Sequence, residues 1–295
     1  MNKGKWEKYY DLPEIQEIRD KIIETYTNKL VFYEIPHEYY LDGIQYISVS
    51  DVTHRYKPIT SEQMAENCVK KWQKEQDPSY KYYGMSKEQI LTQWKVKSDR
   101  ACDFGTDVHA FGESMFYYMT GEPEKILEEC KEQFNENGPQ PSNPQEEAIV
   151  KFWNDLPENF VPVLAETKVF NRNGTQYAGT FDILFYYVEE PESPKNGLVI
   201  FDYKTNEDLY KNYNNQKLLW PFQDMLDQAV SYYTLQLGCY QVPLENLGYK
   251  VIARRLIWVR PNGSYEKVKI DSIADRIRKA LNIPSAQEII ENKIL

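Results

Sequence analysis

Two aspartates that interrupt apolar, strand-like runs constrain the fold more than any other feature of this sequence. Asp182 lies inside AGTFDILFYY, and Asp202 follows GLVIF twenty residues later. A carboxylate among apolar side chains is costly unless it is paired, hydrogen-bonded or bound to a metal ion. The fold must therefore supply a partner for each of these side chains.

The residues around Asp202 indicate which partners these are. Side chains alternate along a strand, so Asp202 and Lys204 share one face and Tyr203 points to the other. Two adjacent strands would bring Asp182, Asp202 and Lys204 together. Such a set suits phosphodiester hydrolysis, because carboxylates hold Mg²⁺ or Mn²⁺ and a lysine stabilises negative charge or orients water. The simpler alternative is an Asp–Lys ion pair at a strand end.

The remaining hydrophobic pattern predicts a mixed α/β core with a helical N-terminal part. Helices are expected over 13–29, 62–100, 101–120, 145–155, about 221–238 and 271–281, with Ser48 or Ser50 capping another near Asp51. Strands are expected in VPVLAETKVF, TQYAGTFDILFYYV and GLVIFDYKT, a hairpin or two short strands in VFYEIPHEYYLDGIQYISVSDV, and a hairpin in VIARRLIWVRPNGSYEKVKI.

The charge distribution limits the kinds of partner. A net charge of −10 argues against non-specific coating of nucleic acid. Residues 65–100 nevertheless hold eight basic and five acidic side chains, interleaved with aromatic residues. This stretch is either a local nucleic-acid surface or a solvated charged face, and its Trp72 and Trp94 suit base stacking or packing equally.

Cysteine usage and hydropathy predict a cytoplasmic protein without membrane contact. Cys68, Cys102, Cys130 and Cys239 are widely spaced, so neither disulfides nor a zinc site are expected. No run of eighteen apolar residues is present, and the N-terminal stretch lacks the apolar segment of a secretion signal.

The chain resembles the PD-(D/E)xK nucleases, because Asp182, Asp202 and Lys204 match the two acids and the lysine of that superfamily in order and spacing. The proline of the superfamily name is absent, and Gly179 to Asp182 instead resembles the G-x-x-D form of the RecB-like branch. The resemblance covers roughly residues 101–260. It implies a restriction-endonuclease-like core over 101–295, with a central mixed sheet in αβββαβ order, and a helical and hairpin region over 1–100 that forms a wall or arch over the site.

Upstream of the strands, Gly105-Thr106-Asp107-Val108-His109 resembles the G-T-x-x-H motif of this branch, whose histidine is a metal ligand. A hydrogen-bonded core histidine is the alternative for His109. Glu113 lies four residues further along and would share a helix face with His109, where it contacts metal or pairs with a basic neighbour. Glu166 matches an acid that the branch often carries on the preceding strand, in a role left open.

Downstream, Gln228 and Tyr232 resemble the Q-x-x-x-Y helix motif of the branch. Residues four apart share a helix face, so the pair would accept hydrogen bonds from Lys204 or donate them to a DNA phosphate. Cluster-bearing members of the branch carry a C-terminal cysteine group, whereas only Cys239 follows this motif here. We therefore expect no iron–sulfur cluster.

Taken together, the resemblance implies a Mg²⁺- or Mn²⁺-dependent deoxyribonuclease, preferably an exonuclease acting on single strands or duplex ends. His109, Asp182 and Asp202 would ligate the metal, with the Tyr203 carbonyl as a further ligand. The expected setting is DNA recombination or processing in a bacterial or phage-infected cell, with a recombination or annealing protein as partner. The alternatives are a catalytically inactive nuclease fold that binds DNA or protein, and a structure-specific endonuclease.

Overall fold

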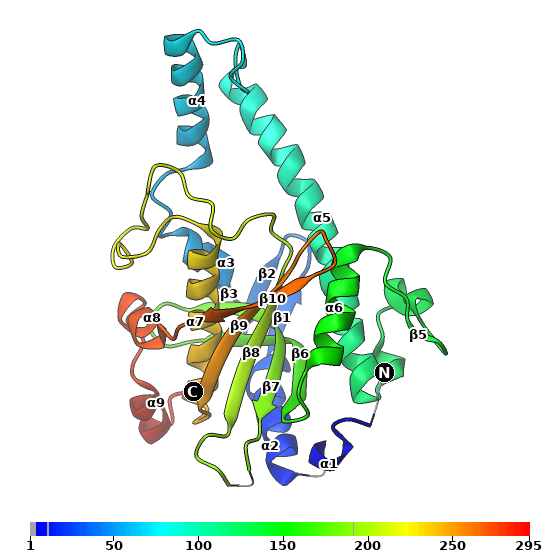
Figure 1. Cartoon of the computed structure of the whole chain (residues 1–295). Coiled ribbons are helices and arrows are strands. Elements are labelled where there is room, and N and C mark those ends of the chain that lie inside the picture. The colour runs from blue at the N-terminus through cyan, green and yellow to red at the C-terminus, as the bar shows by residue number, and fades with distance from the viewer. Residues whose placement is uncertain (1–3, 11, 191) are drawn as a thin grey trace.

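A mixed eight-stranded sheet with helices on both faces forms the centre of the protein (Figure 1). The computed structural model describes residues 4–10, 12–190 and 192–295. Its strands are β1 (Leu30–Tyr33), β2 (Glu38–Leu41), β3 (Ile44–Ser48), β4 (Phe134–Asn135), β5 (Gly138–Pro139), β6 (Phe160–Asn171), β7 (Tyr177–Tyr187), β8 (Gly197–Lys204), β9 (Val251–Val259) and β10 (Tyr265–Ile270). The short β4 and β5 form a separate hairpin.

The helices follow the same chain order. They are α1 (Glu7–Tyr10), α2 (Pro13–Ile22), α3 (Val49–His54), α4 (Ser61–Glu75), α5 (Lys87–Thr120), α6 (Pro144–Asp155), α7 (Ala229–Asn246), α8 (Ala274–Ala280) and α9 (Ala286–Asn292). A π-helical turn at Ile23–Thr27 extends α2, and 3₁₀ turns lie at Pro123–Lys125 and Glu128–Gln133. None of the helices within the described ranges is long and apolar enough to cross a membrane.

Strand β7 is the centre of the sheet. Along one edge it pairs with β6 over its whole length, and along the other edge it pairs first with β3 and then with β8. The β3 pairing ends at Ala178, and the β8 pairing covers Ile183 to Tyr187. Residues 179–182 therefore lie where β3 and β8 diverge from the same edge, and Asp182 is the last of them.

Opposite faces of the sheet are covered by different helices. Tyr203 of β8 points toward α5 and α6, where its hydroxyl accepts a hydrogen bond from Trp153 Nε1 at 2.9 Å. The next side chain, Lys204, points the other way, and its ammonium lies 4.4 Å from the ring centre of Tyr233 on α7. The predicted alternation around Asp202 is therefore confirmed.

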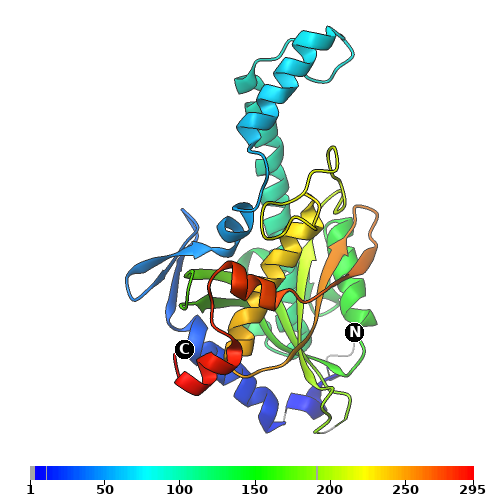
Figure 2. The ribbon, with the colours of Figure 1, turned by 90° about the vertical axis from the view of Figure 1, so that its left-hand side faces the viewer.

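An arm formed by α4 and the first half of α5 projects from this body (Figures 1 and 2). Trp72 and Trp94 are half-buried and hold the arm's tip, since Trp72 Nε1 donates to the Met85 carbonyl and Trp94 Nε1 donates to the Tyr82 hydroxyl. Packing within the arm is thus their role here. Every residue from 95 to 103 is exposed, so this part of α5 is a single helix surrounded by solvent.

Most expected elements are confirmed, including the three strands β6 to β8, the β9–β10 hairpin, helix α6 and Ser48 as the cap of α3. The helical stretch 62–100 is broken at 76–86. Helix α5 runs unbroken through residue 100, and Trp6, Ile15 and Ile22 join the main core, while the division into 1–100 and 101–295 stays a prediction.

The helix expected from Pro221 was wrong over its first eight residues, because α7 begins at Ala229. Residues 205–228 instead form an irregular loop. The Asn212 side chain donates to the carbonyls of Gln216 and Asp227, which offers the backbone an alternative to helical hydrogen bonds. Buried Leu209, Leu218 and Phe222 anchor the loop to the core.

Two glycines of α5 provide a matched test of this packing. A Cβ at Gly112 would lie 2.5 Å from Cε2 of Tyr203. The Tyr203 ring is buried, so it cannot easily move aside. We expect Gly112→Ala to lower the free energy of unfolding by about 1–3 kcal/mol. At Gly105 the nearest atom would be Thr205 Oγ1 at 3.5 Å, so Gly105→Ala should be neutral or stabilising by up to about 1 kcal/mol. Urea unfolding of both variants measures the difference, and equal stabilities would contradict the α5–β8 packing.

Candidate metal centre

Asp182 lies where β8 separates from β7, so the backbone hydrogen bonds between the two strands end there. Its side chain bonds to the β8 backbone instead. Its Oδ2 accepts the Tyr203 backbone N–H at 2.6 Å and lies 3.3 Å from His109 Nδ1 of α5. Burial opposes ionisation of Asp182, but the charges of His109 and Lys204 and these hydrogen bonds outweigh it and lower the pKa of the carboxyl. Asp182 is therefore an ionised carboxylate that the Tyr203 N–H holds in place.

Glu166 of β6 lies opposite Asp182, between the pairs Ala165–Ile183 and Thr167–Phe181. Its φ of +40° is unfavourable for a non-glycine residue in a strand, and such strain concentrates at functional sites. Burial and the charges of Asp182 and Glu113 raise the pKa of Glu166 well above its usual value. The backbone thus holds a second carboxylate close to Asp182 in spite of repulsion.

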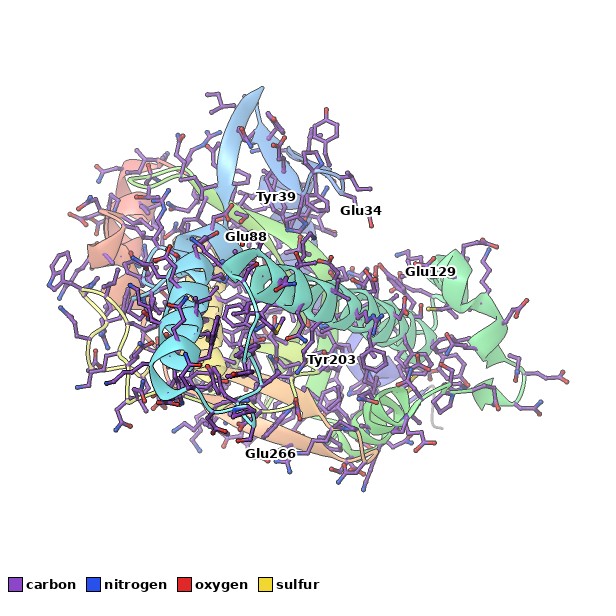
Figure 3. All side chains as sticks on the ribbon, turned by 90° about the horizontal axis from the view of Figure 1, so that it is seen from above. Glu34, Tyr39, Glu88, Glu129, Tyr203 and Glu266 are labelled. Carbon is purple, nitrogen blue, oxygen red and sulfur yellow. The ribbon has the colours of Figure 1, made fainter. Side chains whose placement is uncertain are left out.

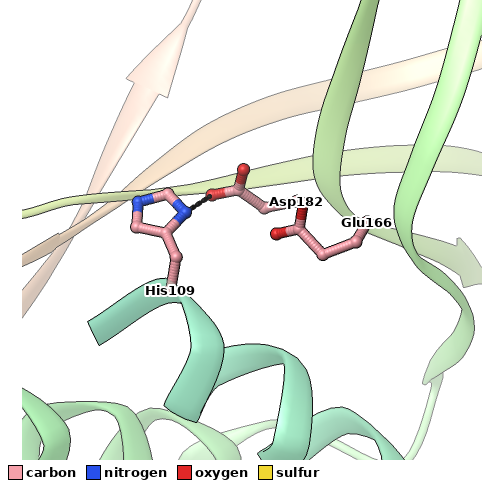
Figure 4. A group of neighbouring side chains, drawn as sticks. All are labelled: His109, Glu166 and Asp182. Carbon is pink, nitrogen blue, oxygen red and sulfur yellow. Dashed lines mark ion pairs between the residues drawn. The ribbon is translucent and has the colours of Figure 1, made fainter. Parts of the chain in front are cut away.

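His109, Glu166 and Asp182 form one cluster (Figure 4). One ligand atom from each lies within 4.8 Å of the others. Burial lowers the pKa of His109, but Asp182 more than offsets this and raises it, so the imidazole carries a proton at higher pH than usual when no metal is bound. The histidine predicted as a ligand is therefore a site residue that contacts Asp182.

Asp202 and Lys204 form an ion pair next to this cluster. Asp202 is 1% exposed, and neither of its oxygens accepts a hydrogen bond of regular geometry from the described residues. Burial and Asp182 raise the pKa of Asp202 to about 6, against the opposing charge of Lys204. Burial would lower the pKa of Lys204, but Asp202 and Asp182 raise it overall, so its ammonium stays charged.

These side chains fit a divalent cation. Three carboxylates lie close together against one lysine and one histidine, and Asp202 has two buried oxygens without a regular hydrogen bond. A cation would relieve the repulsion among these carboxyl groups. Carboxylate oxygens suit Mg²⁺ and Mn²⁺, and the imidazole favours Mn²⁺ over Mg²⁺. His109, Glu166 and Asp182 would hold the ion, with Asp202 beside it.

Glu113 and Tyr203, the other predicted ligands, have contacts of their own beside the cluster. Glu113 is half-buried and accepts a hydrogen bond from Tyr117 Oη at 3.2 Å. Burial raises the pKa of Glu113, with smaller contributions from Glu129 and Asp182. Tyr203 enters the site through its N–H, which donates to Asp182. The Tyr203 carbonyl stays a predicted ligand. Glu166, whose role the sequence left open, is one of the three residues of the cluster.

Helix α7 reaches the site through residues other than the predicted pair. Gln228 precedes the helix as its N-cap, and Tyr232 Oη donates to Asp227 at 2.6 Å. No hydrogen bond joins either residue to Lys204 within the part of the chain that the structure describes. Gln228 therefore lies one residue before α7, and the role of this pair toward Lys204 or a DNA phosphate stays a prediction.

The same spacing recurs eight residues further along. Gln236 Nε2 donates to Tyr240 Oη at 3.1 Å, one turn below Tyr233, whose ring lies under the Lys204 ammonium. Tyr233, Gln236 and Tyr240 therefore form a stripe on α7 that faces the site. A second search for Gln and Tyr four residues apart would have found this pair in the sequence.

No protein-family model matches the chain, and no curated protein shows significant similarity to it.

We expect the substitution Glu166→Gln to affect thermal stability in opposite directions without and with a bound metal ion. The raised pKa of Glu166 means that the folded protein binds its proton more tightly than the unfolded chain. Its carboxylate therefore destabilises the metal-free protein increasingly as pH rises above the usual range of a glutamate. At pH 8 we expect Glu166→Gln to melt at a higher temperature than the wild type without metal, and to lose most of the Mn²⁺-induced stabilisation.

Thermal unfolding with and without Mn²⁺ measures both effects. A hundredfold excess of Mn²⁺ over its Kd should raise the melting temperature of the wild type by about 5 °C. Glu158→Gln is the control, because Glu158 is an exposed partner of Lys8 on the surface, and it should keep the full Mn²⁺ effect. An undiminished Mn²⁺ effect in Glu166→Gln would contradict the assignment of this ligand.

Proposed function

We propose that the protein is a Mn²⁺- or Mg²⁺-dependent deoxyribonuclease that hydrolyses phosphodiester bonds at DNA ends. The observation that carries the proposal is the cluster of His109, Glu166 and Asp182 within 4.8 Å, beside the Asp202–Lys204 ion pair. The order α5-α6-β6-β7-β8-α7-β9 supports a restriction-endonuclease-like core as part of the same proposal.

The charge states of the site residues support this chemistry. A cation bound by the cluster would polarise the scissile phosphate and favour ionisation of the attacking water. Lys204 is held by Asp202 and stays protonated, so it acts as a fixed positive charge and donor toward the developing phosphate charge, and not as a base. Asp182 stays ionised, and the Tyr203 N–H fixes its orientation.

Surfaces around the site support DNA as the substrate. Helix α5 carries His109 into the cluster and continues outward as the arm, where Lys95, Lys97 and Arg100 are exposed. The loop that follows Lys204 exposes Tyr210, Tyr213 and Trp220, at 49%, 63% and 75%. Cations and exposed rings near a phosphate-cleaving site suit a single strand, because phosphates pair with cations and bases stack on rings. Partner proteins in recombination or annealing stay a prediction.

The two alternatives are a catalytically inactive binding module and a structure-specific endonuclease, and different observations distinguish each from an exonuclease. A catalytically inactive DNA- or protein-binding module would have no use for a strained Glu166 or a buried Asp202 without regular hydrogen bonds. A structure-specific endonuclease would share the same chemistry but would cut inside a strand. Linear and closed circular DNA substrates therefore distinguish an exonuclease from an endonuclease.

Cleavage of end-labelled linear DNA and of the same DNA as a closed circle tests the proposal. With Mn²⁺ or Mg²⁺ we expect the wild type to degrade the linear form and spare the circle, and EDTA to abolish cleavage. Lys204→Ala should lower the rate roughly hundredfold or more, because one transition-state donor is lost.

Lys195→Ala serves as the matched control. Lys195 is an exposed lysine that pairs with Glu189 just before the far end of β8, so its loss should leave the rate unchanged. Cutting of the circle would indicate an endonuclease. Absence of metal-dependent cleavage on single strands and duplexes alike would contradict the proposal.

A further inference from the structure

A cavity of about 250 Å³ opens beside the metal centre, and Glu166 belongs to both. Its other walls come from the β1–β2 hairpin, the start of α3, strand β7 and helix α7. The residues that carry the argument are Phe32, His37, Tyr39, Thr180, Gln236 and Tyr240. Figure 3 labels Tyr39, which belongs to β2 of this hairpin, in the view from above. A ligand in this cavity would therefore lie next to the proposed site of phosphodiester hydrolysis.

One wall of the cavity is a fixed set of aromatic rings. Phe32 stacks on Tyr39 with ring centres 4.6 Å apart and planes inclined by 28°, and His37 meets Phe32 edge-on at 5.0 Å. The Tyr39 hydroxyl lies 3.2 Å from Thr180 Oγ1, which anchors the hairpin to β7 two residues before Asp182. The rings are thus positioned relative to the metal centre before any ligand arrives.

The opposite wall offers hydrogen-bonding groups. Gln236 Nε2 donates to Tyr240 Oη, and the amide oxygen of Gln236 has no hydrogen-bond partner among the described residues. A carboxamide next to aromatic rings can pair with the edge of a nucleobase. Gly179 keeps this wall close to β7, because a Cβ there would lie 2.9 Å from Tyr240 Cε1 and from Val49 Cγ2.

The charge of the cavity excludes a phosphate as its occupant. None of the described residues that line it is a lysine or an arginine, and Glu166 belongs to the cluster as well. Phosphate binding needs cations, which this protein places at Lys204 and along the arm instead. The volume takes one base with its sugar and is too small for a base pair. The fitting occupant is therefore the uncharged part of a single, unpaired nucleotide.

We propose that this cavity binds the unpaired terminal nucleobase of the DNA strand that is cut, stacked on the Phe32–His37 wall and hydrogen-bonded to Gln236. The inference rests on the proposed nuclease function and deepens it. It explains a requirement for an end, because only an unpaired nucleotide can leave the duplex and enter. Closed circular duplex DNA has no such nucleotide.

Single-turnover cleavage of matched oligonucleotides tests this proposal. One has normal bases, one has an abasic residue at its 5′ terminal position, and one has it at the 3′ terminal position. For the wild type, an abasic residue at the end where digestion begins should slow the first cleavage about tenfold. Phe32→Ala should cleave the normal strand about tenfold more slowly and lose most of this difference between normal and abasic ends.

Tyr33→Ala is the matched control, because Tyr33 follows Phe32 on β1, is 54% exposed and does not line the cavity. It should keep the wild-type ratio, and circular dichroism and thermal unfolding of both variants verify folding. Equal first-cleavage rates on normal and abasic ends by an active wild type would overturn the cavity proposal while leaving the nuclease function intact. An unchanged ratio in folded Phe32→Ala would overturn it as well. No cleavage of any strand would overturn both.

Discussion

Asp182, Asp202 and Glu166 bring three carboxylates into the space where β8 separates from β7, and the surrounding structure is arranged to offset their repulsion. Lys204 pairs with Asp202, His109 contacts Asp182, and the Tyr203 N–H takes up the remaining lone pair of Asp182 Oδ2. These partners leave the buried Oδ1 of Asp202 without a hydrogen bond among the described residues and a strained backbone at Glu166. A bound cation would offset the repulsion among the three carboxyl groups that Lys204 and His109 do not balance.

Each layer of the fold contributes one part of this balance. Helix α5 approaches β8 closely enough to deliver His109 because Gly112 leaves room for the Tyr203 ring. Strand alternation then sends Lys204 to the other face, where the Tyr233 ring of α7 supports its ammonium. The same helix continues with Gln236 and Tyr240 into the neighbouring cavity, so one stripe of α7 serves the charged centre and the cavity.

The core of this site was predictable from the sequence because each signal was local. Asp182, Asp202 and Lys204 stand out as polar residues in apolar strands, and His109 lies in a motif with its own spacing. Glu166 was singled out only by its match to an acid of the branch, and its role stayed open because that role depends on a positive φ and on lying opposite Asp182. The role of Gln228 and Tyr232 stays a prediction, because Gln228 lies just outside α7 as its N-cap. The cavity was not predictable, because it joins a hairpin and a helix about two hundred residues apart.

The central claim is that His109, Glu166 and Asp182 together hold one divalent cation. Crystals grown with Mn²⁺ and measured at an X-ray wavelength that gives manganese a strong anomalous signal test it most directly. We expect an anomalous peak within bonding distance of an imidazole nitrogen of His109 and of carboxylate oxygens of Glu166 and Asp182. Occupied Mn²⁺ sites elsewhere, with these three side chains still in contact and no peak between them, would contradict it.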